Sequence, residues 1–594
     1  MPSFDTRNPN YVYIDSSEAL REVLPELKQA EVIAVDTEAT GLDPYTCTLL
    51  LVQIGVPNKA FIFDARRVDL TLLKPVLEDS AKLKLLQNAK FDYNLIRVKT
   101  GISMNNMFDS MIAERLLTNG ISREVSLLSI ANKYLGVNLE KAVRQTFVNP
   151  KIDFSQAQLE YSALDVLVMF PIFKSQFALL QKENLTRIAN LEFQLIPVVG
   201  EMEIHGSLVD RIKWESNIRE LEQKRVQIAA KIQDFLRPLY LISQMDLFGA
   251  AVDVININSQ PQVLDAFARL GVDIPSTGVA VLQRTDHEFA KMLLEYREYE
   301  KLISAFGFNF LEKINPKTGR IHPDYMQVGA DSGRFACSNP NLQQIPKESA
   351  FRSCFTAPPG RKLITADYSQ AELRILAEVS GDPVFVRAYK EDADVHTLTA
   401  SQMFKVPEEK VSKELRFQAK SINFGLMYGR GGASLAAQIG VSADEGKRLL
   451  DTYFNTYKKV KKWLDKAAKE AVENGYATTL GGRKRWFVMP DKGDPNYDRL
   501  IGSIERQGKN TPIQGTSADM TKYALVYISQ ALKKEGLDAY PIQTVHDEII
   551  VEAAEEAAPR VKEIMEEEMT RAHETLIKTV PAKVDAVISD LWEH

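Results

Sequence analysis

Two apolar segments in the C-terminal half of the sequence run into carboxylates. KLITAD ends in Asp367 and is followed by helix-compatible sequence, while QTVHDEIIVEA places Asp547 and Glu548 between two apolar runs, as at the turn of a hairpin. Short apolar runs bounded by polar residues are typical of buried strands. These apolar runs are therefore predicted to be strands that carry the acids at a strand end and at a hairpin turn. Taken singly, each motif is equally consistent with an acid that merely ends a strand.

A stripe of functional side chains is predicted between these two motifs, in ELRFQAKSINFGLMYGRGG. Arg416, Lys420, Phe424 and Tyr428 recur every four residues, so on a helix they share one slowly drifting face. A core-facing stripe would be apolar throughout, whereas this one begins with two cations and ends with two rings. Cations suit a triphosphate, and rings suit stacking on a base. The alternative is an amphipathic packing helix with stray charges.

The N-terminal region carries another set of carboxylates. In IAVDTEATGL, four apolar residues lead into Asp36 and Glu38. Positions i and i+2 of a strand point to the same face, so these two carboxylates converge. Two negative charges so close together are unfavourable unless a cation lies between them, and Mg²⁺ prefers oxygen ligands of this kind. The alternative is two solvated charges at the end of a strand.

Two further segments extend this motif. QNAKFDYNL places Asn88 and Asp92 four residues apart, on one helical face, and YSALDVL does the same for Tyr161 and Asp165. With the three motifs in this order, the region resembles the DEDD-type 3′→5′ exonucleases of the tyrosine-bearing subclass. The resemblance implies that Tyr161 helps to orient the attacking water. The carboxylates implied as ligands of two divalent metal ions are Asp36, Glu38, Asp92 and Asp165.

The order of elements predicts more than one domain, as the length of 594 residues also does. Residues 1–185 alternate strand-like and helical runs, which indicates an α/β domain. Residues 186–330 are mostly helical, and two long charged segments there pair either as a projecting arm or as a plain structural hairpin. A long helical region is expected between about 383 and 475.

Composition excludes several classes of protein. The sequence shows no uninterrupted run of about 18 apolar residues, so no transmembrane helix is expected. The N-terminus does not resemble a secretory signal. Three scattered cysteines do not form a metal cluster or a disulfide framework. The net charge of −6 argues against a uniformly basic surface, but Lys and Arg cluster locally at 458–462 and 483–485.

From about residue 190 to the C-terminus, the chain resembles family A DNA polymerases of the bacterial polymerase I type. DSGRFACSNPNLQQIP is similar to the primer-template-binding segment of that family. DYSQAELR, RFQAKSINFGLMYG and VHDE are similar to its three polymerase motifs. GYATTLGGRKRW and ERQGKNTPIQGTSADM stand in the expected places between the last two motifs.

The resemblance implies a role for each matching residue. Asp367 and Asp547, with the backbone of Tyr368, would bind two Mg²⁺ ions, and Glu548 would support that site. Lys420 would also act as general acid toward pyrophosphate. The nucleotide-binding residues implied are Arg416, Lys420, Phe424, Tyr428, Gln370, Glu372 and His546. The DNA-contacting residues implied are Arg334, Asn341, Gln343, Arg506, Asn510 and Gln514.

Two of these residues bear on substrate choice. Glu372 would sit under the sugar, where its side chain penalises a ribonucleotide, so dNTPs are expected over rNTPs. Phe424 in place of Tyr implies discrimination against dideoxynucleotides, which a Phe424→Tyr variant should relax.

The expected architecture is an α/β exonuclease domain (a mixed sheet with helices, ribonuclease H-like) plus an α+β right-hand polymerase domain with palm, thumb and fingers. The exonuclease domain is placed at 1–185 and the polymerase domain at 186–594. Within the latter, the thumb spans about 212–325 and the fingers about 383–475. The palm takes 186–211, 326–382 and 476–594.

The expected function is template-directed DNA synthesis from dNTPs on a primed DNA template, with 3′→5′ exonucleolytic proofreading. Each active site is expected to use two Mg²⁺ ions, with Mn²⁺ as a substitute. The expected partners are primer-template DNA, a single-stranded DNA 3′ end and dNTPs, bound by a monomer away from membranes. The expected location is the cytoplasm (the nucleoid or a phage-infected host), with an organelle matrix as the alternative.

Three alternatives remain but are less favoured. A nuclease with a decayed polymerase half is disfavoured because every proposed polymerase ligand is present. Glu372 and the proofreading domain point away from a single-subunit RNA polymerase, and a non-enzymatic DNA-binding scaffold would need no carboxylate pairs. The sequence also departs from the family pattern. Ala39 replaces a usual Thr, which is expected to have little effect because Ala39 is not a proposed ligand. The primer-binding segment has Phe335, Ala336, Cys337 and Gln344 where Leu, Ser, Ser and Asn are commoner. No 5′-nuclease segment precedes the exonuclease motifs, so no intrinsic flap cleavage is expected.

Overall fold

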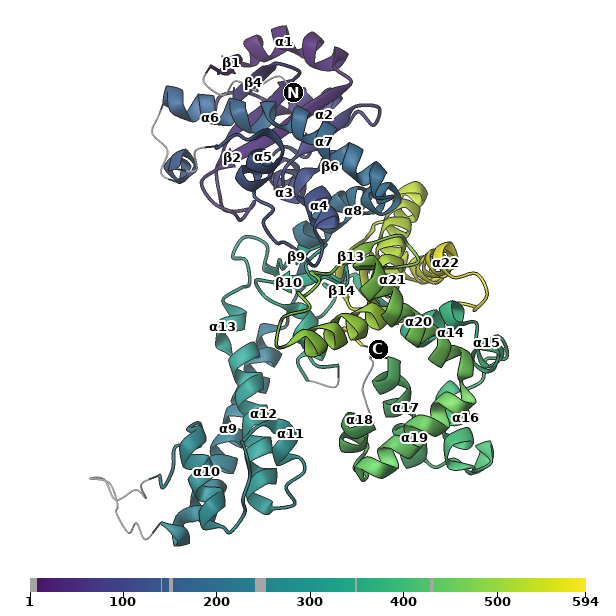
Figure 1. The fold of residues 1–594 in the computed structure, drawn as a ribbon. Helices are drawn as coiled ribbons and strands as arrows, with labels where there is room; N and C mark the ends of the chain where they lie inside the picture. The colour runs from purple at the N-terminus through teal and green to yellow at the C-terminus, as the bar shows by residue number, and fades with distance from the viewer. Residues whose placement is uncertain are drawn as a thin grey trace, which may run out of the picture. The chain divides into compact units, whose positions relative to one another are not determined.

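The computed structural model describes residues 8–139, 142–148, 153–240, 253–347, 350–427 and 432–593. The chain divides into two compact units (Figure 1). The first is drawn from Met1–Gly206, Pro323–Gln344 and Ala357–His594, and the second from Ser207–His322 and Ile345–Thr356.

The N-terminal part of the first unit is built on a six-stranded mixed sheet in the order β1-β4-β3-β2-β5-β6. Parallel pairs join β1 to β4, β2 to β5 and β5 to β6, and antiparallel pairs join β3 to both its neighbours. The central β3 is buried at every position, which explains its apolar sequence LLLVQIGV. The strands are β1 (Tyr11–Ile14), β2 (Val32–Ala39), β3 (Leu49–Val56), β4 (Lys59–Asp64), β5 (Leu83–Leu86) and β6 (Met107–Asp109).

Helices surround this sheet, and α6 packs against β2, β3 and β4. Gly55 of β3 allows that close approach, since a Cβ there would lie 3.2 Å from the Val166 side chain. The helices are α1 (Ser17–Gln29), α2 (Lys74–Leu77), α3 (Ala89–Thr100), α4 (Ser110–Leu117), α5 (Leu127–Leu135), α6 (Gln156–Leu167), α7 (Met169–Lys182) and α8 (Thr186–His205). This mixed sheet with helices agrees with the α/β domain expected from the sequence.

One prediction about this region was wrong. Asn88 does not share a helical face with Asp92, because its backbone is left-handed (φ 60°) and α3 begins only at Ala89. Asn88 belongs instead to the connection between β5 and α3. The four-residue spacing therefore does not reflect helical periodicity here.

Within Gln156–Lys182, a window of 18 residues is apolar enough to span a bilayer by length and composition alone. It escaped the sequence analysis because polar residues interrupt it. Half of that window is buried within the fold, and α6, the first helix of the stretch, packs on the sheet. This is the burial expected of a core helix rather than of a lipid-facing one.

The C-terminal part of the first unit is built on a four-stranded antiparallel sheet in the order β14-β15-β11-β16. Its strands are β11 (Arg361–Tyr368), β14 (Ala539–Val545), β15 (Glu548–Ala554) and β16 (Val584–Ser589). Short strand pairs are formed by β9 (Asp324–Met326) with β10 (Ala336–Ser338) and by β12 (Tyr476–Thr478) with β13 (Lys484–Trp486). The helices α14 (Ala371–Ser380), α21 (Tyr497–Glu535) and α22 (Ala558–Leu576) pack around this region.

A helical region separates β11 from β12, as the sequence predicted. Its helices are α15 (Pro383–Lys390), α16 (Val395–Phe404), α17 (Lys413–Met427), α18 (Gly432–Ile439), α19 (Ala443–Thr456) and α20 (Lys458–Asn474). The helix α8 contacts α3 and β6 on one side and α21 and β14 on the other, and is buried at most positions. It therefore belongs to the cores of both sheets.

The second unit is helical, with α9 (Arg211–Leu236) packed along α12 (Glu288–Phe306). The two long charged segments thus form a hairpin, stabilised by an apolar core that includes Ile232, Phe267 and Phe289. Shorter helices α10 (Gln260–Arg269), α11 (Val279–Leu282) and α13 (Phe308–Leu311) complete it, with the pair β7 (Ser207–Leu208) and β8 (Arg320–Ile321).

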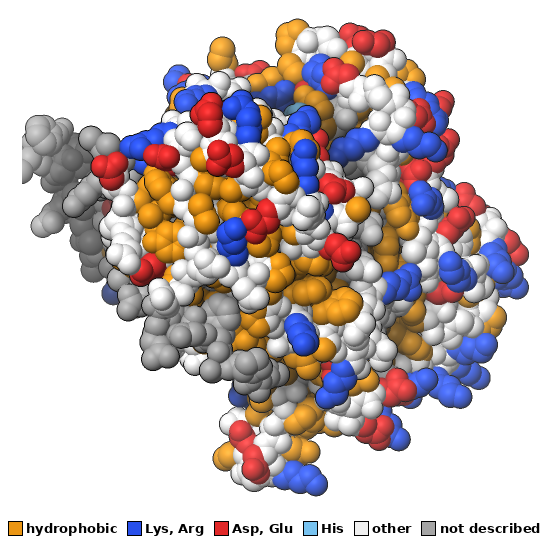
Figure 2. Space-filling view, turned by 90° about the horizontal axis from the view of Figure 1, so that it is seen from above, with side chains coloured by type: hydrophobic (Ala, Val, Ile, Leu, Met, Phe, Trp, Pro, Cys, Tyr) orange, Lys and Arg blue, Asp and Glu red, His pale blue; other side chains and the backbone are white. Residues whose placement is uncertain are grey.

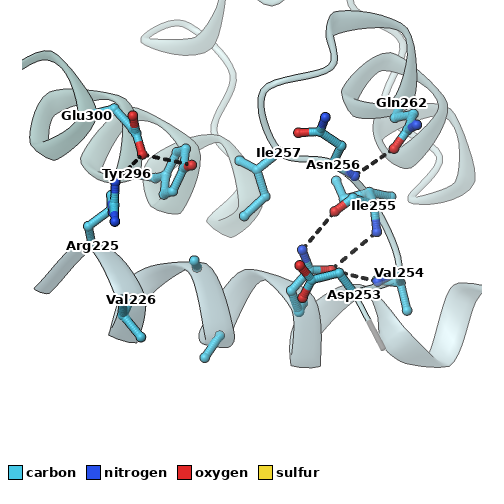
Figure 3. A pocket seen from close by; sticks show the side chains of 13 residues that line it. Arg225, Val226, Asp253, Val254, Ile255, Asn256, Ile257, Gln262, Tyr296 and Glu300 are labelled. Atoms are coloured by element: carbon cyan, nitrogen blue, oxygen red, sulfur yellow. Dashed lines mark hydrogen bonds and ion pairs between the residues drawn. The ribbon is translucent and has the colours of Figure 1, made fainter. Parts of the chain in front are cut away.

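A cavity of about 830 Å³ opens within this second unit, between α9 and the segment 253–257 (Figure 3). On one side of it, Glu300 accepts hydrogen bonds from Arg225 (3.0 Å) and Tyr296 (3.1 Å). On the other, Gln233 bonds the backbone of Val254 and Ile255. The cavity holds none of the predicted catalytic residues.

Acidic and basic side chains are mixed over most of the face drawn in Figure 2. This face therefore shows no single-signed surface, in keeping with a net charge of only −6 for the whole chain.

Candidate active sites

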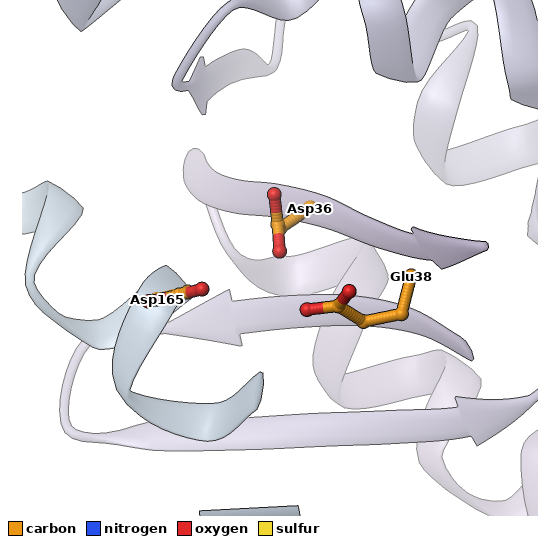
Figure 4. A group of neighbouring side chains, drawn as sticks. All are labelled: Asp36, Glu38 and Asp165. Carbon is orange, nitrogen blue, oxygen red and sulfur yellow. The ribbon is translucent and has the colours of Figure 1, made fainter. Parts of the chain in front are cut away.

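The first candidate site lies where β2 meets α6. Asp36 and Glu38 of β2 and Asp165 of α6 have carboxylate oxygens that all lie within 4.8 Å of one another. Glu38 and Asp165 are buried and Asp36 is half-buried. Figure 4 shows the strand and helix side chains directed into the same space. Three acids this close repel one another unless a cation lies between them, so the group fits a divalent metal ion.

Asp92 lies beside this group but outside it. Its side chain is only 1% exposed and accepts a hydrogen bond from Thr37 Oγ1 at 2.6 Å. Burial, and then the charge of Asp36, raise the pKa of Asp92 well above its usual range. The charge of Asp36 acting on Asp92 shows that the fourth predicted carboxylate lies near Asp36.

Tyr161 lies one turn before Asp165 on α6 and is half-buried. Burial, followed by the charges of Asp165, Glu38 and Asp36, raises the pKa of Tyr161 above its usual value. Its hydroxyl is therefore protonated near neutral pH, and it can donate a hydrogen bond.

Asp109 was missed by the sequence analysis and helps to place Asp92. This buried carboxylate accepts hydrogen bonds from the backbone N–H groups of Asn88 (3.1 Å) and Ala89 (2.8 Å), at the start of α3. It also caps α4 through Met111 and Ile112. Burial raises the pKa of Asp109 to about 6. An aspartate between a strand and a helix is an N-cap signal that could have identified it.

An aromatic cluster beside Tyr161 was also missed. The ring of Phe147 lies 6.5 Å from that of Tyr161 and 6.1 Å from that of Phe154. The Arg66 guanidinium covers Phe154 at 4.3 Å, while it also bonds the buried Asp64. Phe147 is fully buried, so this cluster packs behind Tyr161 and is not an exposed stacking surface.

The second candidate site lies at the end of the four-stranded sheet. Asp367 is the residue before the last of β11, and Asp547 occupies the turn between β14 and β15. The register pairs Ala366 with Ile549, so Asp367 lies next to that turn. Burial, and then the charges of Asp367 and Glu372, raise the pKa of Asp547 to about 7, while Arg334 opposes this shift. The sheet therefore brings both predicted aspartates together, and a divalent cation would relieve their repulsion.

The residues around these aspartates have defined partners. Glu548 is buried and accepts a hydrogen bond from Trp592 Nε1 at 2.8 Å. Glu372 is buried and bonded by Arg334 Nη2 at 2.6 Å. Gln370, in a left-handed conformation, accepts a hydrogen bond from the Tyr389 hydroxyl at 3.0 Å.

Two further predicted residues are the sequence neighbours of these aspartates. The Tyr368 hydroxyl donates to the Met569 carbonyl at 2.8 Å, so its ring points into the core beside α22. His546 is exposed at the tip of the β14–β15 turn, with a left-handed backbone (φ 59°). His546 is therefore a solvent-exposed neighbour of Asp547 in the sequence.

The helix α17 carries the predicted cationic stripe. Arg416 and Lys420 are both exposed and lie one turn apart. Arg416 Nε bonds Asp394 at 2.6 Å, a partner that the sequence analysis did not find. Phe424 is in the helix, but its side chain and the whole of Tyr428 lie outside the described residues.

The six predicted DNA-contacting residues fall on three segments. Arg506, Asn510 and Gln514 recur every four residues on α21, so they share one side of that helix. Asn341 and Gln343 lie at a short 3₁₀ turn, where the Asn341 side chain accepts from the Gln343 N–H at 3.1 Å.

The basic cluster at 483–485 proves to be structural. Arg483 is 1% exposed and bonds Asp519 (2.8 Å) and Glu192, which also pairs with the buried Lys522. Lys484 pairs with Glu183 and Arg485 with Asp331. These charges join the β12–β13 pair to α8 and α21, and are not a free phosphate-binding surface. The sequence analysis missed this because the partners are remote in the chain.

Comparison with known proteins identifies the same two regions. Residues 220–594 match the family described as DNA polymerase family A, and residues 11–179 match a 3′-5′ exonuclease family. The POL domain of Pol1 from M. smegmatis, solved in complex with DNA primer-template and dNTP, superposes with a TM-score of 0.82 at 26% identity. That match covers 98% of this chain and 99% of the other.

Curated relatives agree with these matches. DNA polymerase I of Pseudomonas aeruginosa is 34% identical over 604 residues, and that of Chloroflexus aurantiacus is 30% identical over 624. The matches cover 96% and 99% of this chain, which spans only 64% of the length of either relative. DNA polymerase I of Aquifex aeolicus is 30% identical, with 98% of this chain and 99% of that protein covered. Because the polymerase family matches well over half of the sequence, and a relative of similar length aligns from end to end, this chain belongs to DNA polymerase family A.

Proposed function

We propose that this protein carries out template-directed DNA synthesis from dNTPs on a primed DNA template and proofreads its product with a 3′→5′ exonuclease. The observation that carries the proposal is the presence of two separate groups of converging carboxylates. Each lies in the region matched by the corresponding family. Chemistry with two metal ions needs acids gathered in this way and no nucleophilic Ser or Cys.

In synthesis, Asp367 and Asp547 would hold two divalent ions, with Mg²⁺ preferred and Mn²⁺ as a substitute. Such ions lower the pKa of the primer 3′-hydroxyl and neutralise the charge of the leaving pyrophosphate. The crowding that raises the pKa of Asp547 supports this assignment. Lys420 grips the triphosphate and donates a proton to pyrophosphate, and Arg416 exchanges Asp394 for the triphosphate.

Selection of dNTPs is assigned to Glu372. Its carboxylate is buried and held by Arg334, so it cannot easily move aside for a 2′-hydroxyl. A fixed side chain at the sugar imposes a steric and desolvation penalty on ribonucleotides.

In proofreading, Asp36, Glu38, Asp92 and Asp165 would hold the two divalent ions of the exonuclease. Tyr161 stays protonated and donates a hydrogen bond that orients the attacking water. The buried ring of Phe147 packs beside Tyr161 and helps to hold it in place.

The other assignments follow from this activity. We propose primer-template DNA and a single-stranded 3′ end as partners, a monomeric state and a cytoplasmic location. The second unit, 207–322 with 345–356, would serve as the thumb, which the sequence analysis placed at about 212–325. The region of α15–α20 would serve as the fingers, and Arg506, Asn510 and Gln514 would contact DNA.

A labelled primer-template assay tests the proposal. With Mg²⁺ and dNTPs the primer should be extended, and without dNTPs it should be shortened from its 3′ end, faster when that end is mismatched. Shortening without extension would leave only an exonuclease. Extension without shortening would show that the Asp36 group does not form a working site.

A further inference from the structure

Gln53 is a polar residue in the otherwise apolar strand β3. The register of the sheet pairs it directly with Asp36 of β2. Residues opposite each other in an antiparallel pair point to the same face with neighbouring Cβ atoms. The Gln53 side chain is fully buried, with 0% exposure. A buried amide therefore lies beside one of the three clustered carboxylates.

Neither polar atom of this amide, Nε2 or Oε1, has a hydrogen-bond partner among the described residues. The same holds for the hydroxyl of Ser162, which is also 0% exposed and lies on α6. The face of β3 that carries Gln53 is the one against α6, since Gly55, two residues along, contacts Val166. Both unmatched groups therefore lie in the layer from which Asp36 and Asp165 emerge.

Buried polar groups are nearly always hydrogen-bonded, because an unmatched one destabilises the folded protein. An apolar side chain would fill this position of a central strand at lower cost. Side chains around a metal site commonly hydrogen-bond the ligands, and their loss weakens metal binding. The Gln53 amide is placed for such a role, since its neighbour across the sheet is Asp36.

We propose that Gln53 is a positioning residue of the exonuclease site, whose amide hydrogen-bonds Asp36, or a water of the bound divalent ion, once that ion is in place. This inference rests on the proposed exonuclease function. Gln53 does not touch the DNA or the reacting atoms. Gln53 raises the affinity of Asp36, Glu38 and Asp165 for the ion. Its unmatched amide makes the metal-free protein less stable than it would be with an apolar residue at this position.

The test is a Gln53→Met variant of the full chain, because Met is close to Gln in shape and has no amide. Asp367→Ala and Asp547→Ala are added to parent and variant, so that Mn²⁺ binding followed by electron paramagnetic resonance reports the exonuclease site. The dissociation constant for Mn²⁺ should rise by roughly 10–100-fold. The melting temperature of the metal-free protein should be unchanged or higher. An unchanged dissociation constant overturns the proposal.

Gln176 of α7 provides the matched control. It is also 0% exposed, but its Nε2 donates to the Ser110 carbonyl and to Glu114, each at 3.0 Å. Gln176→Met should lower the melting temperature and leave Mn²⁺ affinity unchanged. If Gln53→Met behaves in the same way, Gln53 is only structural and the proposal is overturned.

Two further measurements keep the test decisive. If Gln53→Met does not fold, Gln53→Asn keeps the amide but shortens its reach, and it should still weaken Mn²⁺ binding; unchanged binding overturns the proposal. If Asp36→Ala does not alter Mn²⁺ binding by the parent, the exonuclease assignment itself is contradicted, and this inference with it.

Discussion

The two carboxylate sites of this protein differ in how their charged side chains are paired in the absence of ligands. In the exonuclease site the acids crowd together, and the nearby cation Arg66 is occupied by Asp64. In the polymerase site the cations are paired with acids of the chain itself, as Arg416 is with Asp394 and Arg334 with Glu372. Under the proposed function, the first site would need only metal and DNA. The second would have to exchange at least one internal ion pair when a nucleotide binds.

Substitution of one acid in each site should give the largest effects. Asp36→Asn should reduce 3′ shortening by about 10³-fold or more and leave primer extension intact, whereas Asp547→Asn should do the reverse. The reason is that each acid serves one group of metal ligands only. Single-turnover rates of excision and extension measure both effects. If either variant lost both activities while keeping its melting temperature, the sites would not be independent.

The buried charges around Glu192 should affect both sites together, because α8 belongs to both cores. Glu192→Gln leaves Arg483 and Lys522 buried without their shared carboxylate. Breaking a buried ion pair on one side typically costs about 3–5 kcal/mol. A large fall in melting temperature is therefore expected, with both activities lost at the same temperature. The exposed Glu563, which pairs with Arg560, provides the control, since Glu563→Gln should change little.

Removal of the Glu372 side chain should sharpen the contrast in substrate choice. Glu372→Ala should reduce discrimination against rNTPs by about 10–100-fold, because the side chain that fills the sugar site is gone. The ratio of kcat/KM for dNTP and rNTP measures this. Excision by the same variant should match that of the parent, and unchanged discrimination would refute the assignment.

Release of Arg416 should give the smallest effect. Asp394→Asn removes its partner, and a partly exposed ion pair is worth about 1 kcal/mol or less, or about fivefold in binding. The KM for dNTP should therefore fall by up to about fivefold. Asp392 pairs with Lys583 nearby, and Asp392→Asn should leave KM unchanged. A rise in KM for Asp394→Asn would contradict the proposed exchange.

Sequence patterns predicted what depends on local order. The strands that carry Asp36 and Asp367 and the turn at Asp547 follow from short apolar runs, and the helix of Arg416 follows from four-residue periodicity. Patterns failed where partners are remote, as with Arg483, whose partners Glu192 and Asp519 lie on two different helices. The prediction for Asn88 was wrong for a local reason. Asn88 and Asp92 are four residues apart, but Asn88 lies just before the first residue of the helix. The position of the Gln53 amide beside Asp36 could not be predicted from the sequence, because it depends on the register between β2 and β3.

The most direct test of two independent sites in one chain is a single primer-template assay, with a mismatched 3′ end, on the parent and on Asp36→Ala and Asp367→Ala. The account predicts that the parent excises the mismatch and then extends, that Asp36→Ala fails to excise but extends a matched primer, and that Asp367→Ala excises without extending. Loss of both activities in either folded variant, or retention of both, would contradict it.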